Sequence, residues 1–405
     1  MAGKTSRNRR VVSGMRPTGP LHLGNYHGAL SNWVELQYRY ECFFFVADWH
    51  ALTTGYEDTV AIKSNAREVI IDWLGAGLNP GACTMFVQSR IPEHAELHLI
   101  LSMITPVTWL ERVPTYKDQI EQLKDKDLST YGFLGYPLLQ SADILMYRPE
   151  FVPVGEDQVA HVEITREIAR RFNNIYGREP DFEARCERAI RRLGSRNSAL
   201  YAELRTQYQQ QGNTEALTRA RVLVESGARL TVADRERLLG HLEGGGRSIL
   251  TEPAALLTRS PKVPGLDGRK MSKSYGNTIG LREDPDSVAK KLRGMQTDPA
   301  RVRRSDPGDP DKCPVWDLHR IYSSDATKSW VQAGCRSAGI GCLECKKPLI
   351  ESVITEIDGI RKRAREFEES PEVVGNIIAD GCERAREAAR MTMDDVRSAI
   401  GLEYR

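Results

Sequence analysis

A turn rich in proline and glycine, RPTGPLHLGN from Arg16 to Asn25, stands directly before the first helix that the sequence predicts. The N–H groups of a helix's first turn lack partners within the helix, and together with the positive end of the helix dipole they favour an anion. His22 and Asn25 add side-chain donors without fixed charge, and Gly24 permits close approach to the backbone. Neither the G-x-G-x-x-G nor the P-loop pattern occurs here. The turn therefore predicts a phosphate site of another kind, with an ordinary loop and a capping asparagine as the alternative.

A second motif, GRKMSKSYGN from Gly268 to Asn277, carries two lysines and two serines on a loop bounded by glycine. The ammonium groups of Lys270 and Lys273 can stabilise negative charge that develops on a leaving pyrophosphate, and the hydroxyl groups of Ser272 and Ser274 can add hydrogen bonds. Such a loop alone is often plain surface. Its combination with HLGN after a first strand is much more specific.

A carboxylate, Asp143, lies in the apolar stretch QSADILMY. Burying an unpaired carboxylate costs several kcal/mol, so a buried Asp143 requires a hydrogen-bonding partner. We expect Asp143 to bind a polar group of a substrate, with a helix-surface or capping position as the alternative.

Four of the eight cysteines crowd together in the last third of the chain. Cys313, Cys335, Cys342 and Cys345 form the pattern C-x21-C-x6-C-x2-C. Four thiolates can enclose a tetrahedral zinc ion or an iron–sulfur cluster, and in a reducing compartment a metal site is expected before a disulfide. Four unrelated thiols are the alternative.

The elements that position these residues alternate between strand and helix over residues 9–180. RRVVS, ECFFFVAD and CTMFVQS read as strands, and the continuous apolar run of the second fits a parallel sheet covered on both faces. The pattern predicts a doubly wound α/β domain of the Rossmann type, with its ligand crevice at the carboxyl ends of the strands.

The rest of the chain divides by composition. Residues 183–249 contain no proline and carry more arginine than acidic residues, and this composition predicts a helical insertion. We therefore expect the first part of the catalytic domain at 1–182, the insertion at 183–249, the return with the KMSKS loop at 250–283, and an all-helical domain with the four cysteines at 284–405.

The composition is that of an ordinary globular protein. The 405 residues carry a formal net charge of +2, so a polyanion must be met by local patches such as Arg301 to Arg304. No run of eighteen apolar residues occurs, and the basic start lacks a signal-peptide core. The sequence therefore indicates a cytoplasmic protein with no membrane partner.

HLGN and KMSKS together resemble the two signature motifs of the class I aminoacyl-tRNA synthetases, with HLGN in the place of the family's HIGH. GMRPTGPLHLGNYHGAL, ADWHALT, YPLLQSADILMY and VPVGEDQVAHVEITREIARRFN are similar to the tryptophanyl branch in particular. The resemblance spans roughly residues 11 to 300 apart from the insertion.

This resemblance implies that ATP activates L-tryptophan to an adenylate, with Mg²⁺ on the phosphates, and that the amino acid then passes to tRNA(Trp). It also implies a homodimer, a helical domain that binds the anticodon, and a four-iron, four-sulfur cluster there, with zinc as the alternative. Lys346, Lys347 and Arg336 beside the cysteines are cations suited to phosphate contacts. A tyrosine-specific enzyme and a non-catalytic RNA-binding paralogue are the alternative functions.

The resemblance assigns each site by matching positions. The catalytic residues are His22, Lys270 and Lys273. The ATP-binding residues are Arg16, Pro17, Thr18, Gly24, Asn25, Gly155, Glu156, Asp157, Val263, Lys270, Met271, Ser272, Lys273 and Ser274. The tryptophan-binding residues are Asp143, for the indole N–H, with Tyr136, Gln140, Gln158 and His50. The metal ligands are Cys313, Cys335, Cys342 and Cys345.

Overall fold

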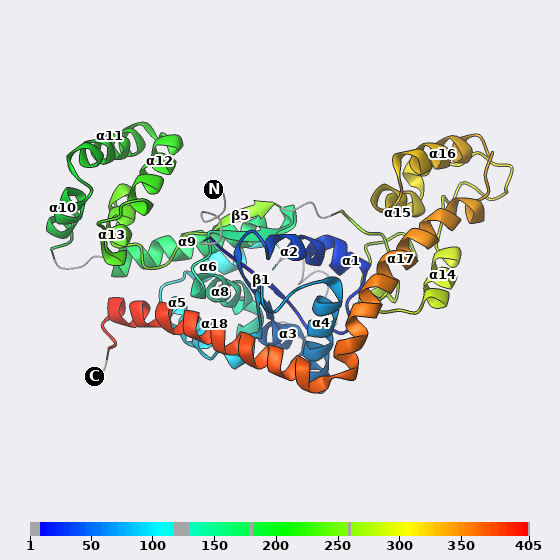
Figure 1. The fold of residues 1–405 in the computed structure, drawn as a ribbon, viewed down its shortest axis with the longest axis horizontal. Coiled ribbons are helices and arrows are strands. Elements are labelled where there is room, and N and C mark those ends of the chain that lie inside the picture. The colour runs from blue at the N-terminus through cyan, green and yellow to red at the C-terminus, as the bar shows by residue number, and fades with distance from the viewer. Residues whose placement is uncertain (1–8, 115, 117–128, 178–180, 258–260, 404–405) are drawn as a thin grey trace. The chain divides into compact units, whose positions relative to one another are not determined.

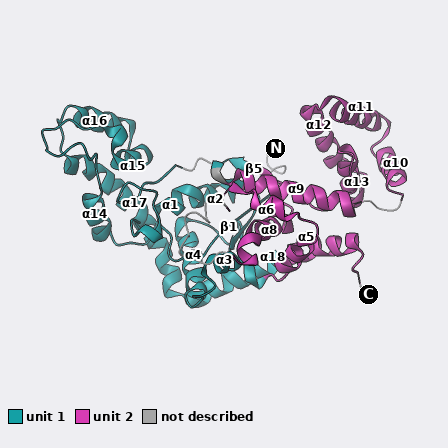
Figure 2. Cartoon of the chain, turned by 180° about the vertical axis from the view of Figure 1, so that it is seen from behind, with its two compact units in different colours: residues 1–90, 153–157, 256–385 teal, residues 91–152, 158–255, 386–405 magenta. Residues whose placement is uncertain are grey.

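The computed structural model describes residues 9–114, 116, 129–177, 181–257 and 261–403. The chain forms two compact units, each built from several stretches of sequence (Figures 1 and 2). Unit 1 comprises residues 1–90, 153–157 and 256–385, and unit 2 comprises residues 91–152, 158–255 and 386–405.

A five-stranded sheet has the strand order β3-β2-β1-β4-β5. The strands are β1 (Arg10–Met15), β2 (Glu41–Val46), β3 (Thr84–Val87), β4 (Phe151–Val154) and β5 (Ala254–Leu257). β1 pairs with β2 in parallel, with Val12 opposite Phe43, and β2 pairs with β3 in parallel, with Phe44 opposite Met85. The Rossmann-like α/β fold predicted from the sequence is confirmed.

The core of unit 1 forms because β2 is buried on both faces. The Phe44 ring is fully buried and stacks on Trp33 of α2 (Ser31–Leu36), with ring centroids 4.5 Å apart. Trp73 of α4 (Ile62–Ala76) meets Trp33 edge to face. Burying such rings contributes roughly 25 cal/mol for each Å² of apolar surface removed from water, so these contacts fix the helices on the sheet.

The helix expected after Gly24 differs from a regular α-helix. It begins as α1 (Leu23–Asn25), continues as the π-helical turn η1 (Tyr26–Leu30), and becomes α2. In η1 the N–H of Ser31 donates to the carbonyl of Tyr26, five residues back. His27 in this turn is bound by Tyr322 and Glu356, at 2.7 and 3.1 Å from its Nε2. Contacts with such distant residues leave no trace in the local periodicity, which explains the difference.

The remaining helices of unit 1 include the long helices of the C-terminal part. They are α3 (Asp48–Gly55), η2 (Gln88–Arg90), η4 (Lys273–Tyr275), α14 (Pro285–Gly294), η5 (Pro310–Lys312), α15 (Pro314–Tyr322), α16 (Asp325–Arg336) and α17 (Cys342–Glu369). Gly75 lets α17 lie close to α4, because a Cβ at Gly75 would come within 2.8 Å of the Cβ of Ala364. The helix α18 (Pro371–Ile400) contributes residues to both units.

Unit 2 is helical apart from its share of β4 and β5. Its helices are α5 (Glu93–Ser102), α6 (Val107–Glu111), α8 (Tyr131–Met146), α9 (Val159–Tyr176), α10 (Phe182–Arg192), α11 (Ser195–Gln211), α12 (Thr214–Glu225) and α13 (Val232–Leu242), with η3 (Glu156–Gln158) at the passage between the units. Helices α10 to α13 share a hydrophobic cluster of their own, centred on Tyr201, Ala220 and Leu238 (green in Figure 1).

The two units do not follow the four segments expected from composition, because each unit gathers stretches from distant parts of the chain. Those segment boundaries stay a prediction. In the part of the chain that the structure describes, no helix is both long enough and apolar enough to cross a bilayer.

Candidate active site

The HLGN turn places His22 at the N-terminal cap of α1, directly after the loop that holds Arg16, Pro17 and Thr18. The Asn25 side-chain oxygen accepts the N–H of His22 at 3.1 Å, so the asparagine closes the turn and keeps its NH₂ group as a donor. The ring of His22 is 8% exposed, and its Nδ1 is buried without a hydrogen-bond partner among the described residues. This nitrogen can still take part in a hydrogen bond with a bound ligand.

The electrostatic surroundings keep His22 neutral. Burial, and after it the charge of Lys273, lowers the pKa of His22 to about 4. At neutral pH the imidazole therefore offers one donor and one acceptor without a positive charge.

The KMSKS loop meets the HLGN turn through the backbone of unit 1. The N–H of Leu23 donates to the carbonyl of Ile279 at 3.0 Å, and the N–H of Leu281 donates to the carbonyl of Leu21 at 3.0 Å. Gly24 leaves room for this approach, because a Cβ there would lie 3.4 Å from the Cβ of Met271 and 3.0 Å from the ring of His22. The fold thus joins two motifs that lie about 250 residues apart in the sequence.

Lys273 reaches back onto the loop that precedes His22. Its Nζ donates to the carbonyl oxygen of Gly19 at 2.6 Å and lies 3.5 Å from the hydroxyl of Thr18. Burial lowers the pKa of Lys273 to about 8, although the charge of Asp72 opposes that shift. Lys270 and Ser274 are exposed on the same loop, and Ser272 is half-buried.

Asn277 organises this loop, a role that the sequence analysis missed. Its side-chain oxygen accepts the N–H of Ser272 at 2.8 Å, and its NH₂ group donates to Asp267 at 2.7 Å and to the carbonyl of Lys270 at 3.2 Å. Since Asn277 is 3% exposed, these bonds fix the loop from the inside. The only signal in the sequence is that Asn277 ends the motif GRKMSKSYGN.

The other predicted ATP-binding residues also lie in unit 1. The N–H of Met271 donates to the carbonyl of the buried Val263 at 3.3 Å. Gly155 follows β4, and Glu156 begins η3 with an exposed side chain. The side chain of Asp157 lies outside what the structure describes.

In unit 2 the structure gives Asp143 a protein partner. Asp143 lies in α8 and is fully buried, and its Oδ1 is 2.6 Å from Nδ1 of His94 in α5. The Nε2 of His94 is 2.7 Å from the hydroxyl of Tyr147, so the three side chains form a buried chain. The cost of burying this carboxylate is therefore met within the protein, and the contact with an indole N–H stays a prediction.

The other predicted amino-acid-binding residues divide between the units. Tyr136 and Gln140 share α8 with Asp143, and the Tyr136 ring lies 5.8 Å from the ring of His161 in α9. Gln158 ends η3 in unit 2. His50 is 9% exposed in α3 of unit 1.

The four clustered cysteines all lie in unit 1. Cys313 precedes α15, Cys335 lies in α16, and Cys342 and Cys345 begin α17. Burial raises the pKa of Cys345 to about 12, and the proximity of the other three thiols adds to this shift. Four cysteine thiols are the type of ligand that zinc and iron–sulfur sites use. However, no group of three or more His, Cys, Asp or Glu side chains within the described residues is placed to hold a metal ion.

Lys346 corrects one expectation about the cations beside these cysteines. It is 3% exposed, and its Nζ donates to the carbonyls of Arg293 and Met295 at 2.8 and 2.6 Å. This ammonium closes the end of α14 with two of its three donors and is buried, so it is not exposed to the phosphates of a nucleic acid. Lys347 is exposed, and Arg336 lies 3.5 Å from Asp311.

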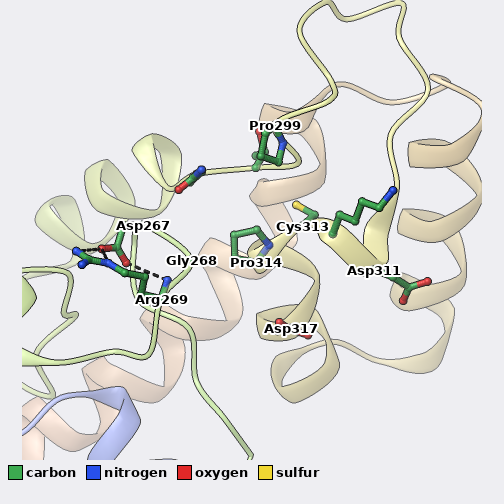
Figure 3. Close-up of a pocket in the computed structure, with 11 residues that line it drawn as sticks. Asp267, Gly268, Arg269, Pro299, Asp311, Cys313, Pro314 and Asp317 are labelled. Atoms are coloured by element: carbon green, nitrogen blue, oxygen red, sulfur yellow. Dashed lines mark hydrogen bonds and ion pairs between the residues drawn. The ribbon is translucent and has the colours of Figure 1, made fainter. Parts of the chain in front are cut away.

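A polar pocket of about 400 Å³ lies beside the start of the KMSKS loop (Figure 3). One side carries Asp267 and Arg269, and the other carries Cys313 and Pro314. Gly268, at φ +81°, allows this close contact, since a Cβ there would lie 3.2 Å from Pro314. The base of the loop therefore rests against the first turn of α15.

Comparisons with known proteins agree with this geometry. The family model described as "tRNA synthetases class I (W and Y)" matches residues 4–185 and 228–357, which leaves 186–227 between the two matched parts. The tryptophan–tRNA ligase of Ralstonia nicotianae is 62% identical over 395 residues, covering 98% of this chain and 99% of the relative. The tryptophan–tRNA ligase of Thermotoga maritima is 43% identical over 397 residues, covering 98% and 100%. The crystal structure of tryptophanyl-tRNA synthetase from Campylobacter jejuni complexed with ADP and tryptophan is similar with a TM-score of 0.70 and 28% identity, covering 97% and 100%.

Proposed function

The chain belongs to the class I tRNA synthetases that comprise the tryptophanyl and tyrosyl enzymes, and on this premise we propose that it is the ligase that joins L-tryptophan to tRNA(Trp) at the expense of ATP. It is an enzyme of the aminoacyl-tRNA ligase class. Full-length relatives that are 62% and 43% identical carry the tryptophan–tRNA ligase name, which favours tryptophan over tyrosine.

The reaction begins when the tryptophan carboxylate attacks the α-phosphate of ATP in line. The bond between the α-phosphorus and the bridging oxygen breaks, and pyrophosphate leaves with the electron pair. A ribose hydroxyl at the 3′ end of the tRNA then attacks the carbonyl carbon of the adenylate, and AMP leaves. Since the protein supplies no nucleophile, its residues act by positioning the substrates and by stabilising charge.

The residues of unit 1 take the ATP side of this chemistry. Neutral His22 and the NH₂ group of Asn25 donate to phosphate oxygens at the start of α1. Lys273 and Lys270 stabilise the charge that moves onto pyrophosphate. Mg²⁺, bound through the phosphates, supplies further charge neutralisation. The remaining ATP contacts expected from the sequence stay proposals of the same kind.

One observation carries this proposal: the backbone pairing of residues 21–23 with 279–281, which places Lys273 beside the turn of His22. Met271 of the loop also packs against Gly24 of α1. A plain surface loop would not need this contact.

The experiment is ATP–pyrophosphate exchange with the purified chain in the presence of either tryptophan or tyrosine. We expect exchange with tryptophan only. Exchange with tyrosine only would identify the sister enzyme, and no exchange with either amino acid would favour a non-catalytic RNA-binding paralogue.

On the amino-acid side we propose that Asp143 accepts the indole N–H and that Tyr136, Gln140, Gln158 and His50 are the other tryptophan-binding residues. His94 supports this role, because its Nδ1 fixes one carboxylate oxygen of Asp143. A fixed carboxylate discriminates between substrates better than a mobile one, since a ligand that cannot donate leaves it unpaired.

We also propose that Cys313, Cys335, Cys342 and Cys345 hold a four-iron, four-sulfur cluster, with zinc as the alternative. The other three thiols lie close enough to Cys345 to raise its pKa further, and this proximity supports a shared site. Such a cluster would supply structural restraint to the starts of α15 and α17 and no redox step. The same proposal includes an anticodon-binding role for residues 284–405, a homodimer, and a cytoplasmic location.

A further inference from the structure

Asp72, a buried carboxylate of α4, binds the HLGN turn directly. It is 1% exposed, and its Oδ2 accepts the backbone N–H of Leu21 at 2.7 Å. Its Oδ1 accepts Nε–H of Arg282 at 2.7 Å. One carboxylate thus holds both the residue before His22 and the residue that follows the segment 279–281.

Arg282 distributes its remaining donors over two other carboxylates. It also pairs with Glu68, on α4, and with Glu368, near the end of α17. Asp72 alone among the three carboxylates is nearly inaccessible, whereas Glu68 and Glu368 have side chains that are 37% and 40% exposed. Asp72 is also the one of the three that the structure connects to the HLGN turn.

The ion pair of Asp72 and Arg282 restrains the arrangement of the segments that it connects. Burial raises the pKa of Asp72, and the charge of Arg282 and the N–H of Leu21 oppose that rise. A buried charge that loses one partner costs several kcal/mol, so the structure favours the arrangement in which both partners are in place. The turn and the segment after the KMSKS loop are therefore held in register through one side chain.

We propose that Asp72 and Arg282 are positioning residues for adenylate formation, which hold the HLGN turn and the KMSKS loop in their mutual arrangement at the ATP phosphates. This role rests on the proposed function, because it assigns the two motifs to ATP. Neither residue touches the reacting atoms; each acts through the backbone and through Lys273.

Asp72 also acts on Lys273 through space. The negative charge of Asp72 raises the pKa of Lys273 against the effect of burial, and the neighbouring His22 is neutral above about pH 4. Lys273 must carry its proton to stabilise pyrophosphate, so activity should fall as the pH rises through about 8. Asp72→Asn removes the charge that raises the pKa of Lys273. The alkaline limb should therefore move to lower pH.

The test compares full-length wild type, Asp72→Asn, Arg282→Lys and the control Glu68→Gln between pH 6.5 and 9.5. Tryptophan-dependent ATP–pyrophosphate exchange gives the KM for ATP and tryptophan, and calorimetry gives the ATP Kd. For Asp72→Asn we expect the KM and Kd for ATP to rise about tenfold, the KM for tryptophan to change less than about twofold, and the limb to shift. Arg282→Lys keeps the charge and loses the fork geometry, so it should weaken ATP binding with a much smaller shift of the limb. Glu68→Gln should resemble wild type in both KM values, in the ATP Kd and in the pH profile.

Folded variants that bind ATP as wild type does and keep its pH profile would overturn the proposal, because a merely structural pair would change only stability. If Asp72→Asn does not fold, the ATP Kd of Arg282→Lys tests the proposal: weaker binding supports it and unchanged binding overturns it. Failure of the proposed function is distinct, since wild type would then show no tryptophan-dependent exchange. The ATP Kd of the variants still tests the positioning role in that case.

Discussion

Lys273 donates a hydrogen bond across 2.6 Å to the carbonyl oxygen of Gly19, although 254 residues separate the two in the chain. The bond places the second lysine of KMSKS over the loop that leads into HLGN. An ammonium group on a backbone carbonyl can exchange that partner for a phosphate oxygen at small cost, because both are oxygen acceptors. We therefore propose that the polyphosphate of ATP meets the loop at this contact.

Replacement of this lysine tests its part in charge stabilisation. Lys273→Ala should lower the rate of tryptophan-dependent pyrophosphate exchange about 100-fold while the tryptophan KM changes less than about twofold. The reason is that the ammonium gains most when charge moves onto pyrophosphate, after tryptophan is bound.

The matched control is Lys262→Ala, which removes an exposed lysine from the same unit outside the motif. It should leave both parameters unchanged. A higher tryptophan KM with an unaltered kcat in Lys273→Ala would contradict the assignment, since it would place the lysine in amino-acid binding.

His22 makes the stability of the fold depend on pH. Its pKa is about 4 in the folded protein, against about 6.5 for an unperturbed histidine. The unfolded chain therefore takes up the proton first as the pH falls. Stability from the neutral ring is complete above pH 6.5 and is lost between 6.5 and about 4, at up to about 1.4 kcal/mol per pH unit.

Urea unfolding of wild type and His22→Gln between pH 7 and 5 measures this dependence. The free energy of unfolding of the variant should decrease less steeply with falling pH, by the equivalent of up to one proton. Identical slopes in the two proteins would show that the imidazole takes up its proton equally in the folded and unfolded states.

Much of the fold could be predicted because its signals are local. A strand as continuously apolar as ECFFFVAD fits few positions other than the interior of a parallel sheet that is covered on both faces, and β2 lies there. The π-helical turn at Tyr26–Leu30 could not be predicted in this way, since contacts of His27 with Tyr322 and Glu356 accompany it. Periodicity reports the face that a residue buries and carries no information about a distant partner.

Partners of buried charges show the same limit. Asp72 stands in VIIDWLGAGL, an apolar run like the one around Asp143, so the cost of burial predicts a partner for both carboxylates. The sequence cannot say which of 57 lysines and arginines serves Asp72, and the partner of Asp143 is a histidine. HLGN and KMSKS were recognisable because each is a short contiguous stretch of sequence. The contacts of Arg282, His94 and Asn277 form only in the tertiary fold.

Asp143 provides a test of amino-acid selectivity. Asp143→Ala should reduce the preference for tryptophan over an analogue whose indole N–H is replaced by sulfur, because a buried hydrogen bond of about 1.5 to 3 kcal/mol is lost. Exchange kinetics with the two amino acids measure the preference as a ratio of kcat/KM. An unchanged ratio would remove Asp143 from the indole site.

Two variants of His94 test whether its hydrogen bond to Asp143 contributes to this selectivity. His94→Leu removes the donor to Asp143 and should lower the same ratio, whereas His94→Asn retains an N–H group close to the position of Nδ1 and should restore most of it. Equal loss in both variants would indicate that the packing of the ring matters and its hydrogen bond does not.

The helical insertion should be removable. The N–H of Arg247 donates to the carbonyl of Gly177 at 2.7 Å, so the chain leaves the segment where it enters, and α10 to α13 have a hydrophobic cluster of their own. Deletion of residues 183–246 with a short glycine–serine bridge should keep tryptophan-dependent exchange within about threefold of wild type. Circular dichroism and exchange assays on the deletion protein measure this, and loss of folding would show that the segment stabilises unit 2.

The cysteine site makes the last prediction. If Cys313, Cys335, Cys342 and Cys345 bind one cluster, protein purified without oxygen should be brown, with about four irons per chain and broad absorption near about 400 nm. A zinc protein would be colourless. Cys342→Ser should abolish the colour, whereas Cys382→Ser, which changes a buried cysteine outside the set, should retain it.

The two reactions of the enzyme then separate the role of the cluster from that of the ATP site. Cys342 begins α17, while Lys273 and His22 lie with the HLGN turn, so loss of a ligand should loosen the starts of α15 and α17 first. Cys342→Ser should therefore weaken charging of tRNA(Trp) and leave pyrophosphate exchange largely intact. If exchange falls as steeply as charging while circular dichroism shows a folded protein, the site is coupled to adenylate formation. That coupling would be carried by α17, whose Glu368 pairs with Arg282 at the other end of the helix.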